Sequence, residues 1–386
     1  MRKDFLTFGN PLIEQPEIDE VVDSLKSGWL GTGPKVKKFE ELFGKYKGVK
    51  YAVALNSCTA ALHLALLAIG IKPKDEVIVP AMTFVATANV VIHAGGTPVL
   101  ADCEKGTMNI DPADVEKKIT KKTKAVIPVH MAGRSCDMDA VMALAKKYNL
   151  KVVEDAAHAV ETEYRGKKAG TFGDIGCFSF YATKNLVTGE GGMAITNNGE
   201  YADKMRILSL HGISADAWQR FGSDGYKHYQ AIYPGYKYNM MDLQAALGIH
   251  QLKKIDKHWA RRQEIWNKYN EAFKNLLVFL PAQIEPNTKH AYHLYTLLLN
   301  IDNLKITRDQ FLEKMTKNNI GVGVHFIAVH MHQYYRDRFG YKKGDFLSAE
   351  WISERTVSLP LSPKLTDDDV NDVITAVTDV LNQQRK

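Results

Sequence analysis

The stretch KVVEDAAHA, residues 151–159, combines the two features that decide the fold of this chain. Its first half has apolar residues at successive positions, which is typical of a strand buried on both faces. Its second half places Glu154, Asp155 and His158 directly after that strand. Ligands of open α/β sheets bind beyond the carboxyl ends of the strands. The stretch therefore predicts a buried parallel strand with a polar site at its end.

Similar apolar runs recur on both sides of this stretch and alternate with helical patterns. The other runs are YAVALNS (51–57), EVIVPA (76–81), TPVLADC (97–103), KAVIPVH (124–130), CFSFYA (177–182) and GGMAITN (191–197). Helical patterns cover residues 59–69, 111–119 and 137–148, with Asp111 before Pro112 and Asp137 as N-cap residues. This alternation predicts an α/β layer fold with a mainly parallel sheet.

The pattern changes after residue 242. A long helix over 242–276, broken near Lys257, precedes an apolar run at 290–301. A helix at 308–318, a strand at 321–327 and a last helix at 367–384 follow. These elements predict two domains, a large α/β domain over residues 1–250 and a smaller α+β domain over residues 251–386.

The composition excludes several classes of protein. The 386 residues are 45% hydrophobic and 24% charged, as in globular proteins, which excludes disordered and fibrous chains. The formal net charge of +6 is too small to argue for a nucleic acid partner. Four scattered cysteines without a C-x-x-C pair argue against a zinc site or disulfide framework and for a reduced, cytoplasmic compartment. No signal-peptide or membrane-spanning segment is expected, since the longest apolar run, 60–71, is too short.

A candidate phosphate site lies in NSCTAALHLALLAIG, residues 56–70. This segment follows a strand and opens a helix, whose N-terminal N–H groups and dipole suit an anion. Taken alone, it is better explained by an ordinary helix with a Ser or Thr cap. It lacks the G-K-[ST] of a P-loop, and no G-x-G-x-x-G opens the first strand–helix turn, so a dinucleotide site has no support.

Two further signals are Asp155 and Lys184. Asp155 ends its strand, although a capping or bracing role would explain it as well, and Glu154 is expected on the opposite side. Lys184 lies in FSFYATKNLVTGEGG, residues 178–192, between an apolar strand and a glycine-rich turn. Most lysines are solvated surface charges, but a desolvated lysine loses its proton and can form a Schiff base. Ser179 can offer its hydroxyl to an anion.

Together these signals match the needs of pyridoxal phosphate. Its aldehyde takes a lysine, its ring nitrogen takes an acidic partner, and its phosphate takes backbone donors and hydroxyls.

The chain resembles the DegT/DnrJ/EryC1/StrS family of sugar aminotransferases almost from end to end. The resemblance rests on SGWLGTGPKVKKFE (27–40), TAALHLAL (59–66), PAMTFVATANVV (80–91), VIPVHMAG (126–133), VEDAAHA (153–159), residues 178–192, PGYKYNMMDLQAALG (234–248) and VSLPLSP (357–363). It implies fold type I of the pyridoxal phosphate enzymes, the aspartate aminotransferase-like fold.

The resemblance also implies catalytic roles. Lys184 would be the Schiff-base lysine and proton shuttle, and Asp155 would pair with the ring nitrogen of the cofactor. His158 would lie beside its phenolic oxygen, and Phe84 would stack on its ring.

Phosphate and sugar contacts follow in the same way. The resemblance implies that Cys58, Thr59 and Ser179 hold the phosphate and that Asn239 reaches it from the neighbouring subunit of a homodimer. Candidates for lining the sugar site are the segment Trp29–Gly33, which includes Thr32, and the residues Tyr181, Glu190, Lys237 and His325. Arg220 is a further candidate cation.

The implied reaction moves an amino group from L-glutamate to a nucleotide-linked keto sugar by ping-pong kinetics. Residues 211–218, 234–239 and 321–340 resemble the branch that aminates C4 of a UDP-linked 4-keto pentose for lipid A and other surface sugars. Amination at C3 and dTDP- or GDP-sugars are alternatives, and a non-catalytic regulator is the alternative of another class. A sister branch of dehydratases carries His where Lys184 stands, which argues against that branch.

Overall fold

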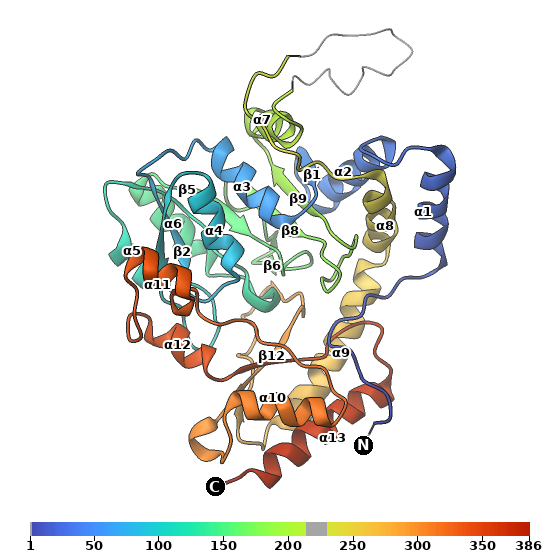
Figure 1. Ribbon diagram of the computed structural model, residues 1–386, viewed down its shortest axis with the longest axis vertical. Coiled ribbons are helices and arrows are strands. Elements are labelled where there is room, and N and C mark those ends of the chain that lie inside the picture. The colour runs from blue at the N-terminus through green and yellow to red at the C-terminus, as the bar shows by residue number, and fades with distance from the viewer. Residues whose placement is uncertain (1, 214–229) are drawn as a thin grey trace.

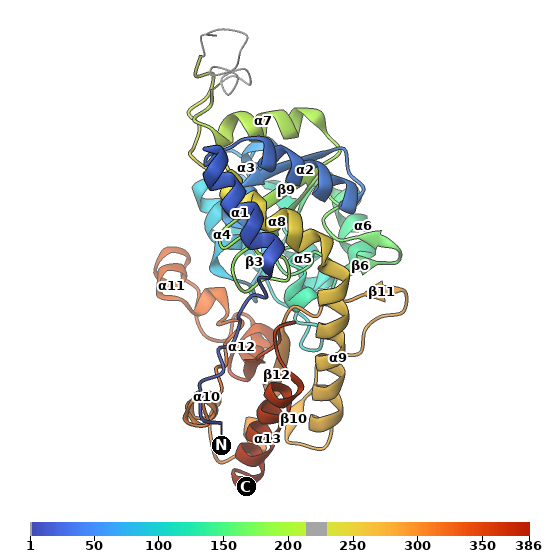
Figure 2. The same ribbon diagram turned by 90° about the vertical axis from the view of Figure 1, so that its right-hand side faces the viewer.

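The computed structural model describes residues 2–213 and 230–386. Figure 1 shows two units, an upper one built around a central sheet and a lower one that holds both ends of the chain. The long helix α9 (Ile255–Phe273) runs from the upper unit into the lower one, as the side view in Figure 2 shows.

The central sheet has seven strands in the order β1-β9-β8-β5-β4-β2-β3. They are β1 (Tyr51–Leu55), β2 (Glu76–Pro80), β3 (Thr97–Ala101), β4 (Thr123–Val126), β5 (Lys151–Asp155), β8 (Ile175–Ser179) and β9 (Gly192–Thr196). Only β9 among them runs antiparallel to its neighbours, and the β8–β5–β4–β2–β3 ladder is parallel throughout. The prediction of a mainly parallel α/β sheet is confirmed.

Alternate residues of each strand enter different cores. Val153 packs with the layer of α3, α4 and α7, whereas Val152 packs with the layer of α5 and α6. On the latter face α2 and α8 cover β1, β8 and β9, where Phe43 contacts the ring of Phe178. The helices are α1 (Gln15–Ser27), α2 (Pro34–Lys47), α3 (Cys58–Ala68), α4 (Val85–His93), α5 (Pro112–Lys118), α6 (Met138–Tyr148), α7 (Gly199–Ser209) and α8 (Asp242–Lys253). Burial on both faces explains why the strands read as unbroken apolar runs.

The lower unit has its own core. A sheet of β10 (Val278–Phe279), β12 (Tyr295–Leu299) and β13 (Thr356–Leu359) packs against α9, α10 (Arg308–Lys317) and α13 (Asp367–Gln383). The N-terminal segment joins this core, since Leu6 pairs with Ile320 and Arg2 forms ion pairs with Asp369 and Asp372. Shorter elements complete the chain: β6 (Glu163–Tyr164), β7 (Lys167–Lys168), β11 (Thr288–Lys289), α11 (Gln333–Phe339), α12 (Leu347–Ser353) and the 3-10 turns Met131–Gly133, Ile301–Asn303 and Val329–Met331.

The predicted break in the long helix is confirmed, at Lys254, three residues before Lys257, where the backbone leaves the helical region between α8 and α9. One local prediction is wrong. Residues 321–327 form no strand, because after an isolated bridge between Gly323 and Ser358 the chain leaves the small sheet. It crosses instead to the large unit, where it lines a cavity. The boundary at residue 250 stays a prediction.

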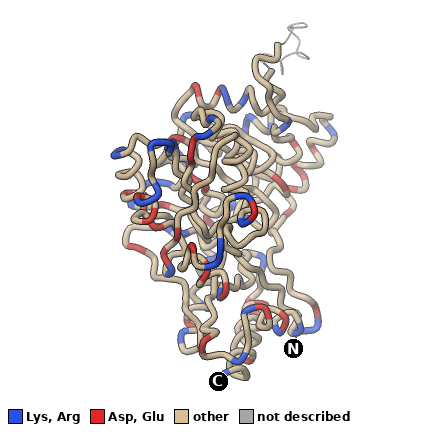
Figure 3. The backbone as a smooth tube through the Cα atoms, turned by 60° about the vertical axis from the view of Figure 1, so that its left-hand side comes forward, with Lys and Arg blue, Asp and Glu red and all other residues tan. Residues whose placement is uncertain are grey.

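Charges of both signs are interspersed along the chain trace in Figure 3. Within residues 2–213 and 230–386, no helix combines the length and the apolar character that crossing a membrane requires.

Candidate active site

A cavity of about 350 Å³ opens beyond the carboxyl ends of the central strands. This is the edge of the sheet at which the sequence predicted a site. The strands β1, β2, β5 and β8 all end at the wall of the cavity. Ten of the predicted site residues line it: Cys58, Thr59, Phe84, Asp155, His158, Ser179, Tyr181, Lys184, Glu190 and His325.

The N-terminus of α3 forms one end of the cavity. Ser57 caps the helix, with its Oγ accepting the N–H of Ala60 at 3.1 Å. The N–H groups of Cys58 and Thr59 lie outside the helical hydrogen-bond ladder and are free to bind an anion. A Cβ on Gly192 would lie 2.4 Å from the carbonyl carbon of Ser57, so glycine alone lets β9 pass this close to the helix end. Burial raises the pKa of the Cys58 thiol, which stays neutral.

Asp155 faces the cavity from the end of β5. Its Oδ2 accepts the hydroxyl of Thr87 at 2.9 Å, and its Oδ1 accepts the N–H of Ala157 at 3.2 Å. Burial raises the pKa of Asp155, while these two hydrogen bonds and the charge of Lys184 act against the rise. A cationic ring nitrogen in the cavity would meet a carboxylate that still has lone pairs to accept it.

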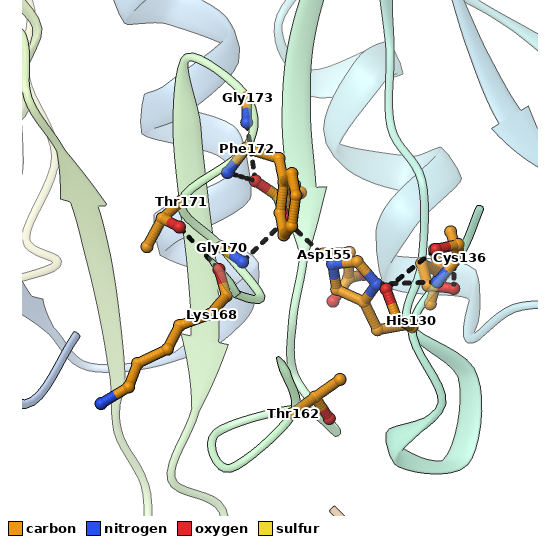
Figure 4. Close-up of polar contacts among 12 residues, drawn as sticks. His130, Cys136, Asp155, Thr162, Lys168, Gly170, Thr171, Phe172 and Gly173 are labelled. Atoms are coloured by element: carbon orange, nitrogen blue, oxygen red, sulfur yellow. Dashed lines mark hydrogen bonds and ion pairs between the residues drawn. The ribbon is translucent and has the colours of Figure 1, made fainter. Parts of the chain in front are cut away.

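Glu154 points to the other side of β5, as the alternation of a strand predicts. Its Oε2 accepts from His130 Nε2 at 3.0 Å and from the N–H of Gly170 at 2.7 Å. Its Oε1 accepts the N–H groups of Phe172 and Gly173, each at 2.7 Å. Figure 4 shows these donors around the strand end. Glu154 therefore holds the loop after β7 and does not reach the cavity.

Lys184 lies in the turn that follows β8, where its N–H donates to the carbonyl of Tyr181 at 2.9 Å. The residue is half-buried and its side chain lines the cavity. Burial lowers the pKa of its amine to about 8, although the neighbouring Cys58 and Asp155 act in the other direction. A substantial fraction of this amine is therefore neutral near physiological pH, as attack on an aldehyde requires.

His158 is held between two rings. Its Nδ1 accepts the N–H of Ala132 at 3.2 Å, so the proton of the neutral ring is on Nε2. The ring centroid lies 4.4 Å from that of His293 and 6.1 Å from that of Phe326. Burial and the charge of Lys184 lower the pKa of His158 well below its ordinary value, which keeps the ring neutral.

Sequence reasoning missed several residues of the site, of which Thr87 and Phe326 make the clearest contacts. Thr87, which holds Asp155, lies one turn into α4, three residues after Phe84. Phe326 lines the cavity with its ring 5.7 Å from that of Phe84. Thr87 belongs to PAMTFVATANVV, one of the stretches on which the family resemblance rests, so the sequence could have indicated it. No local pattern marks Phe326, which comes from the lower unit.

Four predicted residues do not line the cavity of their own chain: Trp29, Thr32, Lys237 and Asn239. Three of them lie near one another on the outside, where Asn239 Nδ2 donates to Thr32 Oγ1 at 2.7 Å and Trp29 packs beside Gly33. Trp29 is 53% exposed. Arg220, together with most of residues 211–218, lies outside the described residues.

The fold and the cavity define a pyridoxal phosphate enzyme of fold type I, since a mainly parallel sheet brings a helix N-terminus, a carboxylate and a lysine of lowered pKa to one cavity. The chain belongs to the DegT/DnrJ/EryC1/StrS aminotransferase family, whose model matches residues 11–378. It is accordingly a sugar aminotransferase, and its cofactor is pyridoxal 5′-phosphate.

Relatives of known name are similar over nearly their whole length. The chain is 55% identical to the uncharacterized protein MJ1066 of Methanocaldococcus jannaschii, with all of both chains covered. It is 52% identical to the spore coat polysaccharide biosynthesis protein SpsC of Bacillus subtilis, covering 98% of each. Among solved structures, the PLP form of the putative sugar aminotransferase Spr1654 from Streptococcus pneumoniae matches with a TM-score of 0.90 and 34% identity, over 98% of this chain and 99% of that one.

Proposed function

We propose that the enzyme moves an amino group from L-glutamate to C4 of a UDP-linked 4-keto sugar and so supplies amino sugars for surface polysaccharide or lipid A. The observation that carries the transaminase chemistry is the placement of Lys184 and Asp155 in one cavity, with the pKa of Lys184 lowered to about 8. The similarity to SpsC, a polysaccharide biosynthesis protein, supports the pathway. The likeness of residues 234–239 and 321–340 supports C4 and UDP.

The bound cofactor supplies an aromatic ring that accepts the electron pair left when a proton is removed from the amino donor. Lys184 would hold the cofactor covalently and, as a neutral amine, would take up the proton removed from the amino donor and return it. Asp155 would pair with the protonated ring nitrogen, and His158 would offer its Nε2–H to the phenolic oxygen. Phe84 and Phe326 would cover the face of the ring.

Phosphate binding is assigned to the end of α3. The N–H groups of Cys58 and Thr59 and the hydroxyl of Ser179 are the donors that this chain offers. Tyr181, Glu190 and His325 line the remaining wall and are proposed to contact the sugar.

We propose a homodimer in which Asn239 reaches the phosphate of the neighbouring subunit. Asn239 does not line its own cavity. Exposed apolar side chains cover the adjoining surface of α1 and the segment after it: Ile18, Val22, Leu25, Trp29 and Leu30. Such a patch is typical of an interface. Trp29, Thr32 and Lys237 would then contact the partner's substrate.

The subunit exchange experiment tests this arrangement. Mixing Lys184→Ala with an inactive Asn239→Ala variant should restore activity, because each heterodimer contains one site without either lesion. Exchange without recovery would show that each site is built from one chain.

The substrate assignment is tested by offering glutamate with UDP-4-keto-pentose, UDP-4-keto-6-deoxy-HexNAc, and dTDP- and GDP-4-keto-6-deoxyhexoses. Release of 2-oxoglutarate and mass analysis of the products should show a preference for a UDP sugar aminated at C4. A preference for a 3-keto sugar or another carrier would overturn the substrate and leave the reaction class intact. Borohydride should fix the cofactor on the peptide that contains Lys184.

The four cysteines are free and buried, which supports the cytoplasmic compartment that we propose for the enzyme.

A further inference from the structure

The wall behind His158 continues inward as a series of buried polar side chains. His293 lies against the His158 ring with centroids 4.4 Å apart, and its Nδ1 is 3.0 Å from Asn185 Oδ1. Asn185 Nδ2 donates to both carboxylate oxygens of Glu161, each at 3.0 Å. Every one of these side chains belongs to a residue that is more than nine-tenths buried. We call His293, Asn185 and Glu161 the inner relay.

The carboxylate of Glu161 fixes the orientation of the relay. An ionised carboxylate only accepts hydrogen bonds, so Glu161 turns the NH₂ group of Asn185 toward itself. The same NH₂ group donates to the carbonyl of Ala291 at 2.8 Å. The Oδ1 of Asn185 therefore faces His293, and the proton of the neutral His293 ring must be on Nδ1.

Both histidines are also tied to Ala132. Its N–H donates to His158 Nδ1 at 3.2 Å, and its carbonyl accepts the backbone N–H of His293 at 3.1 Å. A shift of the His293 ring would disturb the stacking on His158, and a shift of the His293 backbone would move Ala132, whose N–H orients His158. Burial and the proximity of His158 lower the pKa of His293 well below its ordinary value, which agrees with a neutral ring.

We propose that the inner relay is a positioning device that keeps His293 neutral and fixed, so that His158 offers its Nε2–H to the phenolic oxygen of the cofactor in one orientation. The inference rests on the proposed function, which places the cofactor beside His158. Without the relay, the ring behind His158 could exchange its proton between nitrogens or take up a second one beside Lys184.

Glu161 must be ionised for the relay to hold this orientation. Burial raises the pKa of Glu161 to about 7, while the charge of Arg262 and the amide of Asn185 act against the rise. Above that pH the carboxyl is an acceptor only, so the pH titration that tests the relay extends well above pH 7. The titratable groups that face Glu161 come from three other elements: Tyr46 and Lys47 on α2, Arg262 on α9 and Lys289 on β11.

The test measures the pH midpoint at which the visible absorption spectrum of the cofactor-loaded enzyme changes, and compares this midpoint between variants. His293→Phe keeps a ring but removes the Nδ1–H, and Glu161→Gln keeps the shape but adds a donor. A donor at the phenolic oxygen favours its deprotonated form, so a misplaced His158 should raise the pH midpoint, by about one unit in each variant. His293→Asn retains a donor near the Nδ1 position and should recover part of the shift.

His290→Phe is the matched control. His290 is also buried and lies on the same segment, but its ring packs 4.9 Å from Trp266, outside the cavity lining. It should lower thermal stability as His293→Phe does and leave the midpoint unchanged. An unchanged midpoint in folded, loaded His293→Phe and Glu161→Gln, or an equal shift in His290→Phe, would overturn the relay. A wild-type protein that forms no visible band with pyridoxal phosphate would overturn the proposed function, and the relay with it.

Discussion

Glu154 and Asp155 are neighbours at the end of β5, both carry a carboxyl group and both are buried, yet they end in opposite surroundings. Glu154 accepts four hydrogen bonds from His130 and three backbone amides, which use its lone pairs. Asp155 accepts two, from Thr87 and Ala157, and its remaining side faces the cavity. The difference between a bracing carboxylate and one set for a ligand is thus the number of donors supplied by the protein itself.

The pKa shifts of the two carboxyls go in opposite directions. Burial acts to raise the pKa of Glu154, but hydrogen bonds from His130, Gly173 and Gly170 prevail and the pKa is lowered. For Asp155 burial prevails and the pKa is raised. An unliganded Asp155 is destabilised in its charged form, and a cation brought by a ligand would relieve this.

Among substitutions in the cavity, Lys184→Ala should have the largest effect. Lys184→Ala should lower turnover at least about a thousandfold, because it removes both the covalent attachment and the proton shuttle. Cofactor should still bind through the α3 end and Asp155. Equilibrium dialysis and single-turnover assays measure the two effects, and an active variant would end the assignment of Lys184.

Asp155→Asn tests the carboxylate that faces the cavity. Turnover should fall about a hundredfold or more, because a neutral amide does not keep the ring nitrogen protonated. The free energy of unfolding of the apo protein should stay the same or rise, since a poorly solvated charge is removed. Near wild-type turnover would make Asp155 a structural residue.

Glu154→Gln also replaces a carboxyl group by an amide, one residue earlier in the chain. It should lower stability and leave turnover unchanged, the reverse of what we expect for Asp155→Asn. The free energy of unfolding should fall by about 1–3 kcal/mol, because one amide group cannot accept from all four donors. Turnover per folded molecule should be unchanged. Denaturant titration and active-site counting separate the two quantities.

The pH dependence of stability sharpens this prediction. Folding lowers the pKa of the Glu154 carboxyl, so its ionised form stabilises the fold at pH values above the ordinary carboxyl pKa of 4.5. This stabilisation is lost as the pH falls through the pKa of the folded state. The stability difference between wild type and Glu154→Gln should narrow in that acidic range. A constant difference down to pH 3 would contradict it.

Thr87→Val should have the smallest effect. It removes one of the two donors of Asp155 with little change in volume, and a hydrogen bond to a charged group contributes about 1.5–3 kcal/mol. Cofactor affinity should change by less than tenfold, since the bound ring supplies a stronger partner. A loss of cofactor affinity much larger than tenfold would contradict this and show that Asp155 depends on Thr87 for its position.

Much of the fold could be predicted from the sequence because its strands are short apolar runs buried on both faces. Their order could not, since the pairing of β1 with β9 joins residues about 140 positions apart and leaves no local pattern. The strand predicted at 321–327 failed for a related reason. Its alternation looks like a strand, but tertiary contacts carry His325 and Phe326 into the cavity.

A site residue could be predicted from the sequence where its position relative to a strand singled it out. Asp155 and Lys184 stand out because one ends a strand and the other follows one. Asn185 and Glu161 do not, because one lies in a turn and the other in an irregular segment, and only folding brings the amide of Asn185 to the carboxylate. Phe326 likewise gains its place from the packing of two distant units.

The N-terminal segment sets an order of events during synthesis. Arg2 and Leu6 are made before the large unit, whereas their partners Asp369 and Ile320 are made after it. The α/β unit can form its sheet while translation continues. The lower unit cannot close its core until residue 370 or so has emerged, so it folds after the α/β unit. A ribosome-bound chain ending at residue 300 should protect the central sheet from protease and leave the first ten residues open to cleavage.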